Sequence, residues 1–177
     1  MEKKYSISTI KAIIGLGNPG QAYYKNRHSI GFRVLDELAK RHGGSWAKKD
    51  TLETAIIPLG PQIILVKPQT FMNSSGQVLH ILLKKGIKPE QILVIHDELE
   101  KTFGSIMMRF GGSHRGHNGL KSIIGVIGDQ FWRLRFGIDR PSDKNEVADY
   151  VLSNFPPDQE ALISRHIDQA INLLETT

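Results

Sequence analysis

The chain contains the stretch Ile13-Ile14-Gly15-Leu16-Gly17-Asn18-Pro19-Gly20, which predicts a strand that ends in a glycine-rich loop. The run Lys11–Ile14 predicts a short buried strand, which the glycines end abruptly. Pro19 restricts the preceding residue to an extended conformation, so the Asn18 side chain should project from the strand end in a fixed direction. The glycines also allow the backbone to approach whatever binds there. We therefore expect a binding site at the end of this strand.

An amphipathic helix is predicted directly after this strand, over residues 29–41. Its apolar face carries Ile30, Val34, Leu35 and Leu38, and Gly43-Gly44 ends it. His28 therefore lies just before a helix N-terminus. Because the positive end of a helix dipole disfavours an imidazolium, we expect His28 to stay neutral and basic.

The glycines of this stretch also match the dinucleotide-binding pattern G-x-G-x-x-G. That pattern needs a second strand that ends in an acidic residue about 20 positions further on. Asp36 and Glu37 lie near that distance, but inside the predicted helix. Their position disfavours dinucleotide binding, and a purely structural turn remains the other alternative.

Strands and helices alternate through the rest of the chain. Residues 52–59 and 62–67 flank Gly60-Pro61 as a hairpin. Further strands are predicted over residues 92–95, 105–110 and 132–136, and helices over residues 77–85, 120–127 and 157–174. This order predicts a single α/β domain over residues 1–177, with a mixed, mostly parallel twisted sheet and helices on both faces.

The residue patterns also predict which side chains are buried. In the strand over residues 132–136, Trp132, Leu134 and Phe136 should face inward, whereas Arg133 and Arg135 should face out. In the last helix, the predicted buried side consists of Leu162, Ile167, Ala170, Ile171 and Leu174.

Composition narrows the class of protein. The 177 residues include no cysteine, which excludes disulfides, thiolate nucleophiles and cysteine zinc sites. The chain has no 18-residue apolar run, and its N-terminus lacks the apolar segment of a signal peptide, so we expect a soluble cytoplasmic protein without a membrane partner. Residues 1–142 carry 21 Lys and Arg against 11 Asp and Glu, which favours an anionic partner such as a nucleic acid.

Polar side chains follow several of the predicted strands. They are Asn18 with His28, Asn73, Asp97 and Asn118. Open α/β sheets bind ligands beyond the carboxyl ends of their strands, so we expect these side chains to converge.

Five motifs resemble the bacterial peptidyl-tRNA hydrolase family in their order and approximate spacing. They are GLGNPG at 15–20, Tyr23 ahead of Arg27-His28, KPQTFMNSSG at 67–76, HDELE at 96–100, and GHNGLKS at 116–122. The resemblance extends from Lys11 to about Leu174. It implies an enzyme that cleaves the ester between a peptide and the 3′ end of tRNA.

The resemblance also implies roles for individual residues. His28 corresponds to the general base that activates water, and Asp97 to the carboxylate that orients it. The amides that hold the ester and the water correspond to Asn18, Asn73 and Asn118. Tyr23 and Met72 resemble residues that line the peptide and terminal-nucleotide site, and Arg109 and Arg135 fall where the family grips the tRNA 5′-phosphate region. No cofactor or metal is implied, and we expect a monomer.

The sequence departs from the family pattern at a few positions. Ser29 replaces the usual Asn after the catalytic His, and His114-Arg115 interrupt a loop that is usually richer in glycine. Arg109 stands where some relatives have Lys, which keeps the charge but changes the contact geometry.

Two alternatives to the metal-free hydrolase remain at this stage. His114 and His117 have the spacing of a metal-binding pair, although no third ligand lies nearby in the sequence. The second alternative is an RNA-binding paralogue without hydrolase activity. Because His28, Asp97 and all three asparagines are present, the sequence favours the enzyme.

Overall fold

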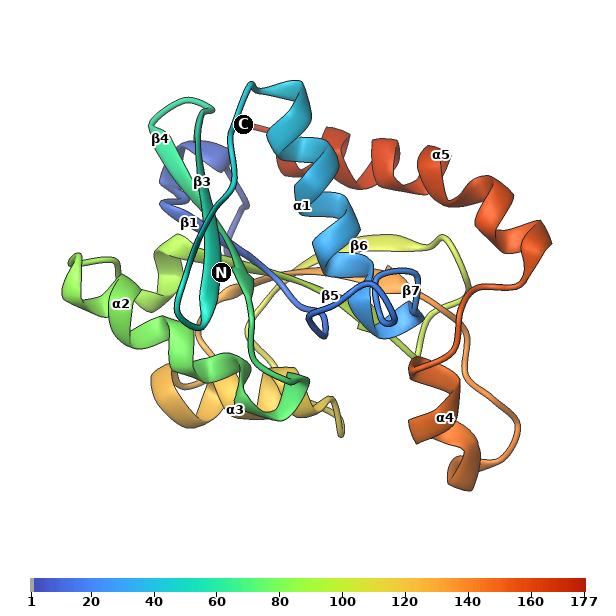
Figure 1. The fold of residues 1–177 in the computed structure, drawn as a ribbon. Coiled ribbons are helices and arrows are strands. Elements are labelled where there is room, and N and C mark those ends of the chain that lie inside the picture. The colour runs from blue at the N-terminus through green and yellow to red at the C-terminus, as the bar shows by residue number, and fades with distance from the viewer. Residues whose placement is uncertain (1) are drawn as a thin grey trace.

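The computed structural model describes residues 2–177. Its centre is a seven-stranded sheet with the strand order β2-β3-β4-β1-β5-β7-β6 (Figure 1). The strands are β1 Ala12–Gly15, β2 Ala47–Lys49, β3 Leu52–Pro58, β4 Gln62–Pro68, β5 Ile92–Glu98, β6 Ile106–Phe110 and β7 Trp132–Gly137. The helices are α1 Ile30–Arg41, α2 Leu79–Lys84, α3 Asn118–Ile127, α4 Val147–Val151 and α5 Pro157–Leu174.

The sheet is mixed, as the sequence predicts. β1 lies between β4 and β5 and is parallel to both, and β5 is also parallel to β7. The other pairs, β2 with β3, β3 with β4, and β6 with β7, are antiparallel. The predicted hairpin is present, and Gly60 has a φ of 70° in its turn. The carboxyl ends of the central strands β1 and β5 therefore meet at one edge of the sheet.

Helices cover both faces of this sheet (Figure 1). α1 and α5 pack on one face and α2 and α3 on the other, so successive residues of β1 enter different cores. Ile13 packs with Leu35 and Ile171 on the first face, and Ile14 packs with Leu79 and Ile123 on the second. No helix within residues 2–177 is long and apolar enough to span a membrane.

The glycines at the end of β1 allow the backbone there to pack closely against the start of α1. A Cβ added at Gly15 would lie 2.5 Å from the carbonyl oxygen of Gly31, and one added at Gly17 would lie 2.7 Å from the Phe32 ring. The prediction that these two glycines let the backbone approach a ligand was therefore wrong, because α1 occupies the space beside them. Asp36 lies on α1 and accepts a hydrogen bond from Lys67 at 2.6 Å, as expected for a residue outside any dinucleotide site.

Two predictions of burial were wrong. Arg133 and Arg135 are 3% and 7% exposed, because the loop after β6 covers the sheet face that they occupy. Arg133 donates to the carbonyl oxygens of Gly112 and Ser113 in that loop. In α5, Leu162 is 43% exposed and Ile163 is buried in its place.

Candidate functional site

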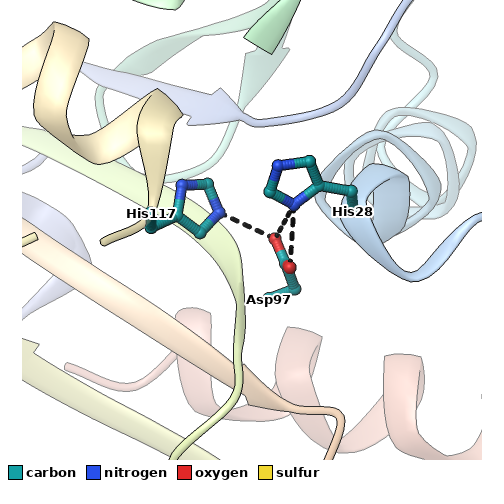
Figure 2. Close-up of side chains that lie close together, drawn as sticks. All are labelled: His28, Asp97 and His117. Atoms are coloured by element: carbon teal, nitrogen blue, oxygen red, sulfur yellow. Dashed lines mark hydrogen bonds and ion pairs between the residues drawn. The ribbon is translucent and has the colours of Figure 1, made fainter. Parts of the chain in front are cut away.

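His28 lies in the short 3₁₀ turn Arg27–Ser29 that leads into α1. It is buried, and its Nδ1 donates to Asp97 at 2.9 Å from Oδ2 and 3.0 Å from Oδ1 (Figure 2). Ser29 Oγ makes no capping hydrogen bond to α1 and accepts instead from the Asn18 N–H at 3.1 Å. The turn that carries His28 is thereby tied to the loop after β1.

Asp97 is positioned by a longer strand than the sequence predicts. β5 continues through Glu98, and every residue of it is buried, so Asp97 stands at the carboxyl end of a central strand. Burial would raise the pKa of the Asp97 carboxyl, but His28 and His117 face it and together hold that pKa well below its usual range. Asp97 is therefore ionised at neutral pH.

The sequence suggested His117 only as half of a possible metal-binding pair with His114, and its contact with Asp97 was not predicted. Its Nε2 is 2.8 Å from Asp97 Oδ1, and its ring centre is 4.7 Å from that of His28 (Figure 2). Its Nδ1 accepts from the N–H groups of Gly119 and Leu120, at 3.1 and 3.3 Å, and so caps α3. Because Nδ1 accepts, Nε2 must carry the proton and donate it to Asp97.

The pKa of His28 shifts in the direction opposite to the one that the sequence predicts. Burial lowers the pKa of its imidazole, but the charge of Asp97 and the hydrogen bond to it raise the pKa by more. The net shift is upward from the ordinary value, so the expectation that the helix end keeps His28 neutral was wrong in direction. Nδ1 holds its proton against Asp97, and Nε2 points away from that carboxylate (Figure 2).

His96 is a buried neighbour of Asp97. Its Nδ1 donates to the Asp97 carbonyl oxygen at 2.8 Å, and its Nε2 has no hydrogen-bond partner in the described chain. Burial, followed by the charge of His117, lowers the pKa of His96 to about 4. At 1% exposure this imidazole is neutral at pH 7 and does not face the solvent.

A cavity of about 450 Å³ opens beside His28 and Asp97. His117 and Asn118, at the start of α3, form a second side, and Val147, Ala148 and Val151 of α4 form another. Its lining carries charges of both signs, because Arg115, Arg140 and Lys144 lie on it together with Glu98 and Glu100. The cavity thus joins an apolar wall to a base and to polar and charged groups, as expected of a binding site for a substrate with apolar and polar parts.

The three asparagines are placed differently with respect to this cavity. Asn118 is exposed and lines it. Asn18 is 6% exposed and lines a separate cavity of about 270 Å³. Its Oδ1 accepts from the Met72 N–H at 2.8 Å, which turns its amide nitrogen away from that contact. Asn73 is exposed and lines neither cavity, and its side chain caps no helix.

Tyr23 and Met72 lie near the loop after β1. Met72 is buried against Asn18, through the backbone hydrogen bond already described. Tyr23 is half-buried, and its ring packs edge-to-face on Phe71 at a centroid distance of 6.2 Å. Phe71 is 62% exposed, so this pair presents aromatic surface to solvent next to the site.

An arginine cluster, made of Arg109, Arg133 and Arg135, lies on one side of the β6–β7 pair. Arg109 is exposed and pairs in register with Arg133. Arg135 is buried and donates to Glu98 Oε1 at 3.1 Å. Burial lowers the pKa of Arg133 to about 10. The charge of Asp129 opposes that shift, and the like charges of Arg109 and Arg135 add to it. Such a cluster favours an anion nearby.

His28, Asp97 and His117 also have the spacing of a metal site, which the sequence did not indicate. Their candidate ligand atoms lie within 4.8 Å of one another. The hydrogen bonds argue for protons in place of an ion: a metal on His117 Nε2 would need that nitrogen deprotonated while Nδ1 already accepts two N–H groups. The trio is better described as two donors on one carboxylate.

Comparisons with known proteins point to one family. The family model described as peptidyl-tRNA hydrolase matches residues 12–177. Peptidyl-tRNA hydrolase of Aquifex aeolicus is 43% identical over 173 residues, which cover 93% of this chain and 88% of that protein. The Rickettsia bellii protein of the same name is 42% identical, with 89% and 87% covered. The crystal structure of peptidyl-tRNA hydrolase from Acinetobacter baumannii superposes with a TM-score of 0.90 at 38% identity, and covers 98% of this chain and 90% of that one.

Proposed function

The chain belongs to the peptidyl-tRNA hydrolase family, and on that premise we propose how its own residues hydrolyse the ester between a peptide and the 3′ end of tRNA. The observation that carries the proposal is the pair of contacts from His28 Nδ1 to both oxygens of an ionised, buried Asp97 beside a large cavity. This geometry leaves His28 Nε2 free to accept a proton. An RNA-binding paralogue would have no use for that arrangement.

His28 acts as the general base in this mechanism. Nε2 takes a proton from a water molecule as the water oxygen attacks the ester carbonyl carbon, and Asp97 stabilises the imidazolium that forms. The carbonyl becomes a tetrahedral oxyanion, which amide N–H groups stabilise. When the bond from carbon to the ribose oxygen breaks, the proton on Nε2 passes to that oxygen. The products are a peptide carboxylate and tRNA with a free hydroxyl.

Asn118, Asn18 and Asn73 supply the amides in this proposal. Asn118 is in the best position, because it lines the cavity beside His28. The contact with the Met72 N–H orients the Asn18 side chain and leaves its amide nitrogen to donate to substrate. Exposed Asn73 needs the substrate to bring it into contact. Tyr23 and Met72 would border the bound end of the substrate.

His117 is added to this set as a positioning residue for Asp97. By donating to Oδ1 while His28 donates to both oxygens, it fixes the carboxylate plane and favours its charged form. Because His117 is also the cap of α3, the same ring sets the start of the helix that presents Asn118.

Arg109 and Arg135 are proposed to attract the tRNA phosphates. Arg109 is exposed and can contact a phosphate directly. Arg135 is buried on Glu98, so its contribution is the field of the arginine cluster and not a contact of its own. We further propose that the enzyme works in the cytoplasm as a monomer and needs no metal.

The proposal is tested by incubating the protein with an N-blocked aminoacyl-tRNA and measuring the tRNA released, with and without chelator. Full activity in chelator is expected, and loss that Zn²⁺ or Mn²⁺ restores would instead make His28, Asp97 and His117 metal ligands. His28→Ala should lower turnover by about 10²–10⁴-fold while tRNA still binds. His80→Ala, at an exposed position on α2, is the matched control. Near-normal turnover by folded His28→Ala protein would remove this base from the mechanism.

A further inference from the structure

Arg27, the residue before the proposed base, is buried at 7% exposure and forms no ion pair with a carboxylate in residues 2–177. Its Nη1 donates to Ser153 Oγ at 2.8 Å and to the Tyr150 carbonyl oxygen at 3.1 Å. Its backbone N–H donates to the Ser153 carbonyl oxygen at 3.1 Å. All of these acceptors belong to the end of α4 and the residues that follow it.

Aromatic rings complete the surroundings of the Arg27 guanidinium. Its central carbon lies 3.9 Å from the centre of the Tyr150 ring and 5.6 Å from that of Phe155. Asn26 adds a side-chain hydrogen bond to Asn154 at 2.8 Å. Residues 150–155 are therefore fastened to the turn that carries His28, and the planar guanidinium is the centre of that attachment.

Outside these contacts, and within residues 2–177, α4 has one further side-chain hydrogen bond to another part of the chain, which the Tyr150 hydroxyl donates to the carbonyl oxygen of Ile138 just after β7. Of its five residues only Val151 is buried, and the helix projects away from the layers formed by α1, α5 and the sheet (Figure 1). Yet Val147, Ala148 and Val151 form a wall of the cavity that His28 borders. Burial of one valine contributes little to holding such a short helix, so its position depends on polar and cation–π contacts.

We propose that Arg27 is a positioning residue that holds α4 at a fixed distance from the turn of His28 and so keeps the cavity in its substrate-binding shape. Molecules in which α4 has moved away bind substrate poorly, and the apparent affinity falls in proportion to the fraction that remains closed. Once substrate is bound, the wall is in place and the chemistry at His28 proceeds normally. The defect therefore belongs in KM and not in kcat.

Arg27→Lys tests this, because lysine keeps the charge but loses the fork and the flat surface that stacks on Tyr150. We expect KM for peptidyl-tRNA to rise about tenfold with kcat within about twofold of wild type. Arg33→Lys is the matched control, since Arg33 bridges α1 to Glu160 of α5 away from the cavity. It should leave KM unchanged. A fall in kcat with unchanged KM in Arg27→Lys would overturn the proposal.

Hydrogen exchange supplies a readout that does not depend on activity. Amides of residues 147–153 should exchange faster in Arg27→Lys than in wild type, while those of β5 keep their protection. Hydrogen exchange depends neither on hydrolysis nor on the role of His28, so it tests the position of α4 separately from the proposed function. Only the kinetic test of Arg27 rests on that function. Unchanged exchange over residues 147–153 would overturn the role of Arg27 even in an active enzyme.

Variants of Tyr150 test the contact with Arg27 by changing the other residue. They also provide a test if Arg27→Lys does not fold. Tyr150→Leu removes both the ring that stacks on Arg27 and the hydroxyl that donates to Ile138, whereas Tyr150→Phe removes the hydroxyl alone. KM should therefore rise in Tyr150→Leu and stay near the wild-type value in Tyr150→Phe. The double variant Arg27→Lys with Tyr150→Leu should be little worse than Tyr150→Leu alone, because the contact between ring and guanidinium is already lost. Additive effects in the double variant would show that the two residues act separately.

Discussion

Asp97 controls the basicity of His28 at the scale of single residues. Burial lowers the pKa of the imidazole, and the Asp97 charge more than reverses that shift. A base must be unprotonated to work, so the raised pKa places the acidic limb of the activity profile above its position for an ordinary histidine. Removing the charge while keeping the burial should move that limb in the opposite direction.

Asp97→Asn provides the test. We expect the acidic limb of kcat/KM to move to lower pH by about one unit or more, because only burial then acts on His28. The plateau should fall as well, but by less than in His28→Ala, since water can partly orient the ring. The measurement is kcat/KM from pH 5 to 9. A limb that stays in place would show that another group, and not His28, titrates there.

His117 can be tested apart from its second role as a helix cap. Asparagine is a good N-cap residue but is too short to reach Asp97, so His117→Asn should keep α3 and lose the hydrogen bond to the carboxylate. We expect kcat to fall about tenfold, the effect of losing one hydrogen bond to a charged group. Thermal stability, measured alongside, should change little. Wild-type kcat in a protein of normal stability would contradict the positioning role.

At the scale of elements, close backbone contact decides where His28 sits. A Cβ added at Gly31 would lie 2.5 Å from the Leu16 nitrogen and 2.6 Å from the Ile95 carbonyl oxygen. Both atoms belong to the backbone, so neither can rotate away. The first turn of α1 is thus fixed against the ends of β1 and β5, and the adjoining turn carries His28.

Gly31→Ala should therefore push α1 off the sheet. Overpacking of this kind costs about 1–3 kcal/mol of folding free energy, and kcat should fall because His28 moves relative to Asp97. Gly125→Ala on α3 is the matched control, since a Cβ there meets nothing within 4 Å and alanine favours helix. Denaturant unfolding and turnover of both variants check this. Equal behaviour of the two variants would refute the packing argument.

Elements were predicted from the sequence wherever a local pattern determines them. The face of α1 formed by Ile30 and Leu38 and the hairpin at Gly60 follow from residue spacing alone. The burial of Arg133 could not be predicted in this way, because the loop that covers it comes from β6 and the alternation of β7 does not show that cover. An arginine facing out from one strand can still lie beneath another segment.

At the scale of the whole molecule, the pairing of His28 with Asp97 could be predicted and the surroundings of the pair could not. His28 follows β1, and Asp97 lies at the carboxyl end of the neighbouring parallel strand β5, so the sheet brings the two motifs to one edge. His117 contacts Asp97 only because α3 begins beside that edge of the sheet. The position of α3 depends on tertiary packing. The contact of Arg27 with Tyr150 spans 123 positions and has no local signature.

The distribution of charge over the whole molecule bears on how it selects its substrate. Residues 101–142 carry seven Lys and Arg against two Asp and Glu, whereas residues 143–177 carry two against seven. Phosphates of tRNA should therefore be drawn to the side of the arginine cluster, and each phosphate contact releases counterions. Free peptides and simple esters lack those phosphates. If charge selects the substrate, removing an exposed arginine should weaken binding of full-length peptidyl-tRNA more than binding of a minimal substrate.

Arg109→Ala should weaken binding of full-length peptidyl-tRNA and flatten the decline of log affinity with log salt by about one unit or less. Cleavage of a minimal substrate with only the terminal nucleotide should barely change, because Arg109 lies outside the cavity of His28. Arg165→Ala, at an exposed arginine of the acidic C-terminal segment, is the control and should keep the wild-type slope. Arg135→Ala should differ from both, since it also leaves Glu98 without its partner and lowers stability, so part of its loss falls on both substrates in addition to the weaker attraction of tRNA. Affinity across a salt series and turnover of both substrates are the measurements. An unchanged salt slope in Arg109→Ala would remove this residue from the phosphate contact, and an equal loss on both substrates would place it in the active site.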